Sequence, residues 1–295
     1  MTHSTDPSAD ASADNFAAFP KDEALVLVAG ATGGVGQLVV ANLVAAGYGR
    51  IRVLTRSADK AKRMFGDRVE IAAGDIKEPD SLAAATEGIT HLICATGTTA
   101  LPTDRWDFKT SPESNPFEQA ATWTRIYLDA DFRNANARNT PEAVDAIGVS
   151  NLVQAAPEGL RRFVFVSSCG VARKDEFPYN LLNAFGVLDA KSKGETAILR
   201  AGLPYTIIRP GQLTDGPYTS RDFNSLVQAK TDGKLGVVMA TGDTLNGQTS
   251  RIDVAAACVA CLESAAAENK AFEIVSKGER PAQIAWEDLF AKASA

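Results

Sequence analysis

The sequence predicts an α/β fold, in which a doubly wound parallel sheet is followed by a small C-terminal lobe. Between Ala24 and Pro210, short apolar segments alternate with amphipathic ones, as strands and helices do in such folds. The apolar segments are continuous, which is typical of strands buried on both faces of a parallel sheet. A cluster of glycines follows the first apolar segment, where the chain must turn sharply into a helix.

The elements follow from this alternation in chain order. The expected strands are Leu25–Ala29, Ile51–Thr55, Val69–Ala73, His91–Ala95, Phe163–Ser167 and Tyr205–Arg209. The expected helices are Gly34–Ala46, Asp59–Phe65, Pro79–Thr86, Pro141–Ala156 and Leu188–Ala201. We expect each helix to cross over one face of the sheet and return the chain to a parallel strand.

Two regions depart from the alternation. Residues 97–140 are long, polar and irregular, and we interpret about 99–140 as an insertion whose Trp106 and Trp123 line a pocket or anchor the loop. After Gly211 the pattern changes. There we expect a helix near Phe223–Lys230, a strand near Leu235–Met239, a helix over Asp253–Glu263, a strand at Phe272–Val275 and a last helix from Trp286. This gives a Rossmann-type domain at 21–210 and a small lobe at 211–295 over the carboxyl edge of the sheet.

Composition narrows the environment and the partners. The 295 residues carry a net charge of −6 without a basic stripe, which argues against nucleic acid as a partner. No apolar run reaches the roughly 18 to 20 residues that span a bilayer, so no membrane span is expected. Residues 1–20 are rich in Ser, Ala and Asp without signal or transit features, and we expect a disordered tail. A reducing compartment is the default, namely the cytoplasm, or the plastid stroma in an alga or plant.

The glycine cluster Gly30-Ala-Thr-Gly33-Gly34-Val-Gly36 has the spacing of a dinucleotide-binding turn. Gly30 lets the chain leave the strand, Gly33 lets the backbone approach a pyrophosphate, and Gly36 lets the helix pack close to the sheet. The free N–H groups at the start of this helix would hold the pyrophosphate. We expect Thr32, Gly34 and Val35 to contact it as well.

The end of the second strand indicates which dinucleotide is bound. A site for NAD usually places an acidic residue there, whereas this chain has Arg56, which can pair with a 2′-phosphate. Lys60 and Lys62 add positive charge, and Asp59 is interpreted as a helix cap. The sequence therefore predicts NADP(H) rather than NAD, with a solvated surface arginine as the alternative for Arg56.

Further coenzyme contacts are expected at the carboxyl ends of the other strands. Asp75, followed by Ile76, is placed to accept from an adenine amino group or to cap the next helix. Small residues let a coenzyme lie on the edge, and Arg209-Pro210-Gly211 should pass beside the nicotinamide or simply form a turn. These remaining expected contacts are Ala95, Thr96, Gly97, Ser167, Arg209, Pro210 and Gly211.

With these motifs, the chain resembles the atypical short-chain dehydrogenase/reductases, and most closely their NAD(P)-binding, NmrA-like branch of cyanobacteria and plastids. The shared motifs are the glycine turn, Arg56, Gly74-Asp75, Phe165-Val-Ser167-Ser168, Lys191, Tyr205-Thr-Ile-Ile-Arg209-Pro210-Gly211, Leu213-Thr-Asp-Gly-Pro-Tyr218 and Ser250-Arg251-Ile-Asp253-Val254-Ala255. The resemblance covers roughly 24–265 apart from 109–139, which could hold a substrate or protein partner. It implies a seven-stranded parallel sheet, a small C-terminal substrate lobe and NADP(H).

The resemblance also raises a question about chemistry. Ordinary members of the superfamily use a Ser, a Tyr and a Lys, with the Tyr four residues before the Lys on one helix face. Ser168 and Lys191 stand where the Ser and Lys are expected, and we take them as the candidate catalytic residues. Val187 occupies the place of the Tyr. Hydride transfer would then need another proton donor, such as Tyr179, Tyr218 or the substrate, or there is no reaction.

Other reactive residues offer no clear metal or nucleophile site. Cys258 and Cys261 have redox spacing, but they lie in an apolar helix and are interpreted as buried. The histidines are His3 and His91, too few for a metal centre or a Ser-His-Asp triad. Two functions stay open: an NADP(H)-dependent reductase of a small or medium organic substrate, and a non-catalytic NADP(H)-binding redox sensor or assembly factor.

Overall fold

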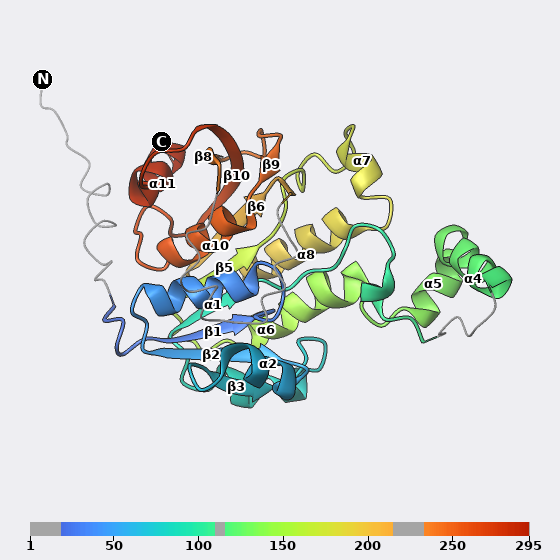
Figure 1. The fold of residues 1–295 in the computed structure, drawn as a ribbon, viewed down its shortest axis with the longest axis horizontal. Helices are drawn as coiled ribbons and strands as arrows, with labels where there is room; N and C mark the ends of the chain where they lie inside the picture. The colour runs from blue at the N-terminus through green and yellow to red at the C-terminus, as the bar shows by residue number, and fades with distance from the viewer. Residues whose placement is uncertain (1–18, 110–115, 215–232, 295) are drawn as a thin grey trace, which may run out of the picture.

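The fold is built on an eight-stranded sheet with helices on both faces (Figure 1). The computed structural model describes residues 19–109, 116–214 and 233–294. The strand order is β3-β2-β1-β4-β5-β6-β10-β8, and the strands from β3 to β10 run parallel. The order reverses between β1 and β4, which is where open sheets of this type bind ligands at the carboxyl ends of their strands. Both the expected tail, up to residue 18, and the helix expected at Phe223–Lys230 lie outside the described residues.

The strands of the first part of the chain agree with the predicted ones to within one residue at either end. They are β1 (Leu25–Ala29), β2 (Arg50–Thr55), β3 (Glu70–Ala73), β4 (His91–Cys94), β5 (Arg162–Val166) and β6 (Tyr205–Pro210). β1 lies between β2 and β4, with Val28 opposite both Val53 and Ile93. All five residues of β1 are buried, as its unbroken apolar sequence predicts.

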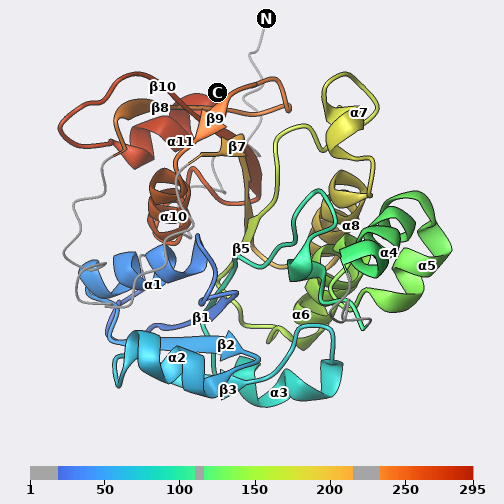
Figure 2. The ribbon, with the colours of Figure 1, turned by 45° about the vertical axis from the view of Figure 1, so that its right-hand side comes forward.

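Alternate residues of β1 point into two separate cores. Val26 and Val28 pack with helix α1 (Gly36–Ala45) on one face, and Leu25 and Leu27 pack on the other. The helices near this second face are α3 (Ala83–Thr86), α6 (Val149–Ala155) and α8 (Val187–Arg200). Figure 2 shows α1 and α6 on opposite sides of the strands, so the sheet is covered on both faces as predicted.

The remaining helices follow local sequence signals. Helix α2 (Ala58–Phe65) is capped by Ser57, whose Oγ accepts from the Lys60 N–H, so the expected cap at Asp59 was wrong by two residues. A proline at its first position starts the short 3-10 helix η1 (Pro79–Ser81). The long helix expected at Pro141–Ala156 has two parts, because its first segment, η3 (Glu142–Gly148), is a π-helix that runs into α6. Such wide turns often occur at functional sites.

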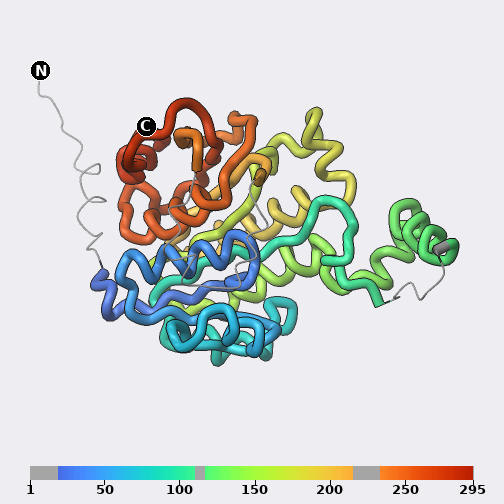
Figure 3. The backbone as a smooth tube through the Cα atoms, viewed as in Figure 1, coloured from blue at the N-terminus to red at the C-terminus, as the bar shows by residue number. Residues whose placement is uncertain are grey.

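The insertion is more ordered than its polar sequence suggested. It contains the 3-10 helix η2 (Asp104–Trp106) and the helices α4 (Pro116–Leu128) and α5 (Ala130–Asn136), which project from the body (Figure 3). Trp106 is buried, and its indole N–H donates to the carbonyl of Thr99. Phe108, Trp123, Tyr127 and Phe185 continue an aromatic cluster from Trp106. These contacts support the anchoring interpretation of the tryptophans.

The C-terminal part adds to the same sheet instead of lying only above it. β10 (Lys270–Glu279) pairs parallel with β6, and β8 (Leu235–Ala240) pairs antiparallel with β10. The sheet therefore has eight strands with one antiparallel edge, where the resemblance implied seven parallel strands. A sequence pattern does not give the direction of an edge strand, and only the pairing decides it. The boundary of the lobe at 210/211 stays a prediction.

The other C-terminal elements complete the first core. Helix α10 (Arg251–Ala260) packs against α1, and α11 (Trp286–Ser294) packs on β8 and β10. The short strands β7 (Gln212–Leu213) and β9 (Gln248–Thr249) pair beside the carboxyl edge, and the short helix α7 (Tyr179–Leu182) precedes α8. Throughout the described ranges, every helix is too short or too polar to cross a membrane.

Candidate coenzyme cleft and active site

Two glycines of the turn are required by backbone packing. Gly30 has a φ of +79°, and a Cβ there would lie 2.7 Å from the backbone nitrogen of Thr96. A Cβ on Gly36 would clash with the carbonyl oxygen of Gly30, so the start of α1 sits directly on the turn. Gly34 differs, because its Cβ would meet only the side chain of Arg251, at 3.1 Å. The turn thus places the N-terminus of α1 at the carboxyl edge of β1, as an anion-binding loop requires.

A cleft of about 470 Å³ opens over this edge, which suits part of a dinucleotide. Of the predicted coenzyme residues, Gly30, Thr32, Gly33, Gly34, Arg56, Asp75, Ile76, Ala95, Thr96 and Gly97 line it. The predicted Val35, Gly36, Ser167, Lys191, Arg209, Pro210 and Gly211 do not form its walls. Lining residues that the sequence analysis did not single out as contacts include Gln37, Lys77, Thr98, Arg105 and Asn139. Which of these residues touch a coenzyme stays a prediction.

The end of the cleft at β2 and β3 carries several cations. Arg56 is more than half exposed, and its Nη1 donates to Asn139 Oδ1 at 3.1 Å. Lys77 Nζ donates to the same oxygen at 2.9 Å. Asp75 Oδ2 lies 3.4 Å from Lys77 Nζ, while its Oδ1 accepts from the Lys77 N–H and so forms a turn instead of a helix cap. The positive charge at this end suits a phosphate group.

Lys191 lies deep at the other side of Gly97. It is only 6% exposed, which excludes a solvated helix lysine. Its Nζ donates to the carbonyls of Val166 and Thr96 and lies 2.8 Å from Asp145 Oδ1. Asp145 is fully buried in the π-helix η3, and its Oδ2 accepts from both the N–H and the hydroxyl of Thr98. Lys191 therefore ties together the ends of β4 and β5.

Asp145 was not predicted as a site residue from the sequence. Its only signal was an acidic residue within an otherwise amphipathic helix, and such residues usually face solvent. The wider π-turn brings it beneath Gly97, where a Cβ would lie 3.5 Å from Asp145 Oδ1 and 3.4 Å from Lys191 Nζ. Both distances are ordinary van der Waals contacts, so Gly97 lies directly against the ion pair.

Ser167 and Arg209 belong to a buried network. Ser167 Oγ donates to Glu195 Oε1 at 2.5 Å, and Arg209 binds both oxygens of Glu195, at 2.9 and 2.6 Å. Glu195 is itself buried on α8. The Arg209 side chain thus holds α8 against β6 and is occupied by Glu195.

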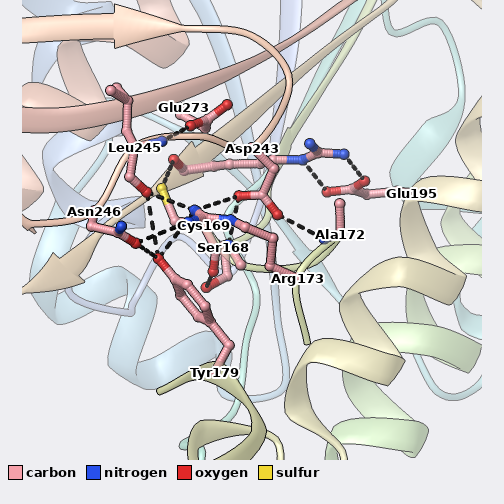
Figure 4. Close-up of polar contacts among 12 residues, drawn as sticks. Ser168, Cys169, Ala172, Arg173, Tyr179, Glu195, Asp243, Leu245, Asn246 and Glu273 are labelled. Carbon is pink, nitrogen blue, oxygen red and sulfur yellow. Dashed lines mark hydrogen bonds and ion pairs between the residues drawn. The ribbon is translucent and has the colours of Figure 1, made fainter. Parts of the chain in front are cut away.

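Ser168 begins a loop that is fastened to the segment before β9 (Figure 4). Asp243, buried and in the left-handed region at φ +57°, accepts from the N–H groups of Gly170 and Ala172, both at 2.7 Å. Its Oδ1 also accepts from Arg173 at 3.3 Å. Asp243 was not singled out in the sequence, although the Gly242-Asp243 pair is a recognisable turn signal.

Tyr179, the first residue of α7, has its ring over Gly170, which leaves no room for a Cβ there. Its hydroxyl donates to Asn246 and accepts from Arg173 at 3.2 Å. Burial raises the pKa of Tyr179, an effect that the Arg173 guanidinium partly opposes. The phenol is therefore protonated at neutral pH. Tyr218, the other tyrosine considered as a proton donor, lies outside the described residues.

The cysteines and His91 are buried and uncharged. Burial raises the pKa of the Cys169 thiol to about 12 and that of Cys261 to about 12 as well. Cys258 in α10 and Cys261 at its C-terminal end are buried free thiols, which agrees with the buried interpretation. Burial also lowers the pKa of His91 to about 4. Among the residues that the structure describes, no group of these side chains could hold a metal ion.

Comparison with known proteins supports what the geometry indicates. The sequence model described as NAD(P)H-binding matches residues 30–265. Sanguinarine reductase from Eschscholzia californica is 34% identical over 262 residues, which are 86% of this chain and 89% of that protein. An uncharacterised chloroplast protein of Arabidopsis thaliana is 33% identical over 278 residues, covering 90% and 81%. The crystal structure of the oxidoreductase ylbE from Lactococcus lactis has the same fold, with a TM-score of 0.61 at 17% identity over 90% and 95% of the chains.

The fold and the cleft thus define a Rossmann-type NAD(P)-binding protein of a reductase-like group. The chain belongs to the NAD(P)H-binding family and is an atypical short-chain dehydrogenase/reductase, as its motifs predicted. The chloroplast relative agrees with the expected NmrA-like branch of cyanobacteria and plastids.

Proposed function

We propose that the protein is an NADP(H)-dependent reductase that transfers hydride to a small or medium organic substrate. The observation that carries this proposal is the position of Lys191, whose buried ammonium group lies next to Gly97 of the cleft lining and pairs with Asp145. A lysine at this place can contact the hydroxyls of a nicotinamide ribose. The reductase among the relatives gives independent support.

The residues present fit this coenzyme. Gly30 and Gly36 leave the loop in close contact with the strand ends, and Arg56, Lys60, Lys77 and Arg105 supply positive charge at the β2 end of the cleft. An acidic ligand for a ribose 2′-hydroxyl does not follow β2, where Arg56 stands. These features favour NADP(H) over NAD. When bound, the coenzyme would supply the hydride.

The chain's own residues would position the reactants. Lys191 would hold the ribose by exchanging one of its carbonyl acceptors, Thr96 or Val166, for a ribose hydroxyl while Asp145 fixes its ammonium group, and Ser168 would orient the substrate. Tyr179, which is protonated at neutral pH and donates to Asn246, is our candidate proton donor among the described residues, with the substrate as the other source. This arrangement favours acceptors that take hydride at an activated carbon, such as quinones and enones, because such substrates depend less on a side-chain proton.

The test is an assay of NADPH oxidation with a panel of quinones, enones and aldehydes. The rate is monitored as the loss of the reduced-nicotinamide absorbance. Lys191→Ala should abolish the rate. Lys193→Ala is the matched control, because Lys193 is exposed on the same helix and pairs only with Glu142 among the contacts described. Equal rates in the two variants, measured at equal folded fraction, would refute the assigned role.

The alternative function is a redox sensor or assembly factor that binds NADP(H) without turnover. Val187 in the place of the usual Tyr and the exposed Phe117 and Leu128 on the projecting helix α4 favour it. The insertion would then be the surface for a protein partner. Micromolar coenzyme binding with no turnover across the panel would support this alternative. Chloroplast relatives point to the plastid stroma, should the host be a plant or alga.

A further inference from the structure

The end of the insertion reaches into the coenzyme cleft. Asn139, the last residue of the stretch that lacks a counterpart in the family resemblance, is only 6% exposed and lines the cleft. Its side-chain nitrogen donates to the carbonyl of Arg105 at 3.3 Å, and its backbone N–H donates to the carbonyl of Trp106 at 2.8 Å. The amide is therefore fixed by the base of the insertion, with its oxygen directed at β2 and β3.

Two cations converge on that single oxygen. Arg56 Nη1 lies 3.1 Å from Asn139 Oδ1, and Lys77 Nζ lies 2.9 Å from it. Lys77 is further held by the carbonyl of Arg138 at 3.2 Å, so two consecutive residues of the insertion bind it. A neutral amide oxygen orients both cations without cancelling their charge. The Asp75 carboxylate lies 3.4 Å from Lys77 and 4.0 Å from Arg56.

This arrangement has the character of a phosphate site. Two like charges held at one atom repel each other, and an anion placed between them removes that repulsion. Asp75 supplies one negative charge against two positive ones, so a dianion would still be attracted. The side chain of Lys77 is 22% exposed and that of Arg56 59% exposed, which leaves both accessible from the cleft.

We propose that the insertion is part of the coenzyme site: Lys77 is a second ligand of the 2′-phosphate beside Arg56, and Asn139 positions both. This inference rests on the proposed NADP(H) binding and deepens it. The insertion then sets the preference for NADP(H) over NAD(H). The merely structural alternative is that Asn139 only fastens the insertion to the body.

The experiment is isothermal titration calorimetry of the full chain with NADP⁺ and with NAD⁺. The variants are Lys77→Met, Asn139→Ala and Asn139→Asp, with Lys193→Met as the control, because Lys193 is an exposed lysine on α8 that pairs with Glu142 and does not line the cleft. Lys77→Met should weaken NADP⁺ binding by about tenfold or more, the value of a charge-assisted hydrogen bond, and leave NAD⁺ binding within about twofold.

Asn139→Ala should lower the NADP⁺ affinity by about fivefold through loss of orientation, again with NAD⁺ little changed. Asn139→Asp keeps the oxygen but adds negative charge, so it should weaken NADP⁺ binding more than the alanine variant does. Losses of equal factor for both coenzymes would mean a structural role and overturn the inference, as would unchanged NADP⁺ affinity in Lys77→Met. A wild-type chain that binds neither coenzyme would instead refute the proposed function itself.

Discussion

The buried ion pair between Lys191 and Asp145 gives a prediction that separates stability from catalysis. Lys191→Met leaves a fully buried carboxylate, and Asp145→Asn leaves a nearly buried ammonium group, so each variant strands one charge. Removing one partner of a buried pair costs about 3–5 kcal/mol of unfolding free energy. The asparagine in the second variant still accepts from Thr98, so most of its loss reports the stranded lysine.

The double variant Lys191→Met with Asp145→Asn should recover much of this loss, because neither charge then remains. We expect the sum of the two single losses in unfolding free energy to exceed the loss in the double variant by at least about 2 kcal/mol. Urea unfolding at neutral pH, followed by circular dichroism, measures all four proteins. Single losses that add to within about 0.5 kcal/mol would refute the coupling of these residues. Coenzyme binding by the folded double variant would then report the contribution of Lys191 apart from stability.

Three further predictions concern the glycine turn before α1, the hydrogen bonds of Asp243 to the loop after β5, and stability in acid. Gly36→Ala should unfold the start of α1 and lower the free energy of unfolding by about 2 kcal/mol or more, as measured by thermal denaturation. Gly34→Ala should stay within about 1 kcal/mol of wild type, because its Cβ meets only the flexible Arg251 side chain. Similar losses in both variants would contradict the packing argument. Asp243→Ala should lower the free energy of unfolding, measured in urea, by about 2–4 kcal/mol, because the buried N–H of Gly170 and the partly buried N–H of Ala172 lose their acceptor. Asp243→Asn should lower it less. Equal effects of the two variants would show that the carboxylate geometry does not matter. His91 has a folded pKa of about 4, below the unfolded value, so the unfolded chain binds the extra proton and stability falls as pH drops from about 6.5 to about 4. That loss is about 3 kcal/mol at most, and His91→Gln should remove it from the pH profile of the unfolding free energy; an unchanged profile would show that His91 is not the group responsible.

Much of the fold was readable because local patterns and long-range packing agree here. The unbroken apolar run of β1 predicts burial on both faces, and its alternate residues do enter two cores. The glycine turn was equally readable, since a positive φ at Gly30 and the contact of Gly36 with the turn are requirements of the backbone alone. Helix boundaries were predicted less well where two neighbouring residues can both cap a helix, as Ser57 and Asp59 can at the start of α2.

Polar sites were predicted only where a motif fixes their spacing. Lys191 was identified from its place on the helix, but its partner Asp145 comes from a π-turn that no simple periodicity reveals. Asn139 lies 83 residues from Arg56 along the chain, and the two meet only because the insertion folds back onto β2 and β3. The strand β8 was predicted near Leu235–Met239, but its antiparallel direction was not, because strand direction depends on which neighbour is available for pairing.

The sequence by itself determined the dinucleotide-binding turn, the strands β1 to β6 with the helices that connect them outside the insertion, and the family, because these depend on spacing within a few turns of chain. Only the tertiary structure decided that Asp145 holds Lys191, that Asn139 joins Arg56 and Lys77, and that β8 and β10 extend the sheet. Such contacts join residues far apart in the chain, and their partners are selected by packing and charge when the elements come together.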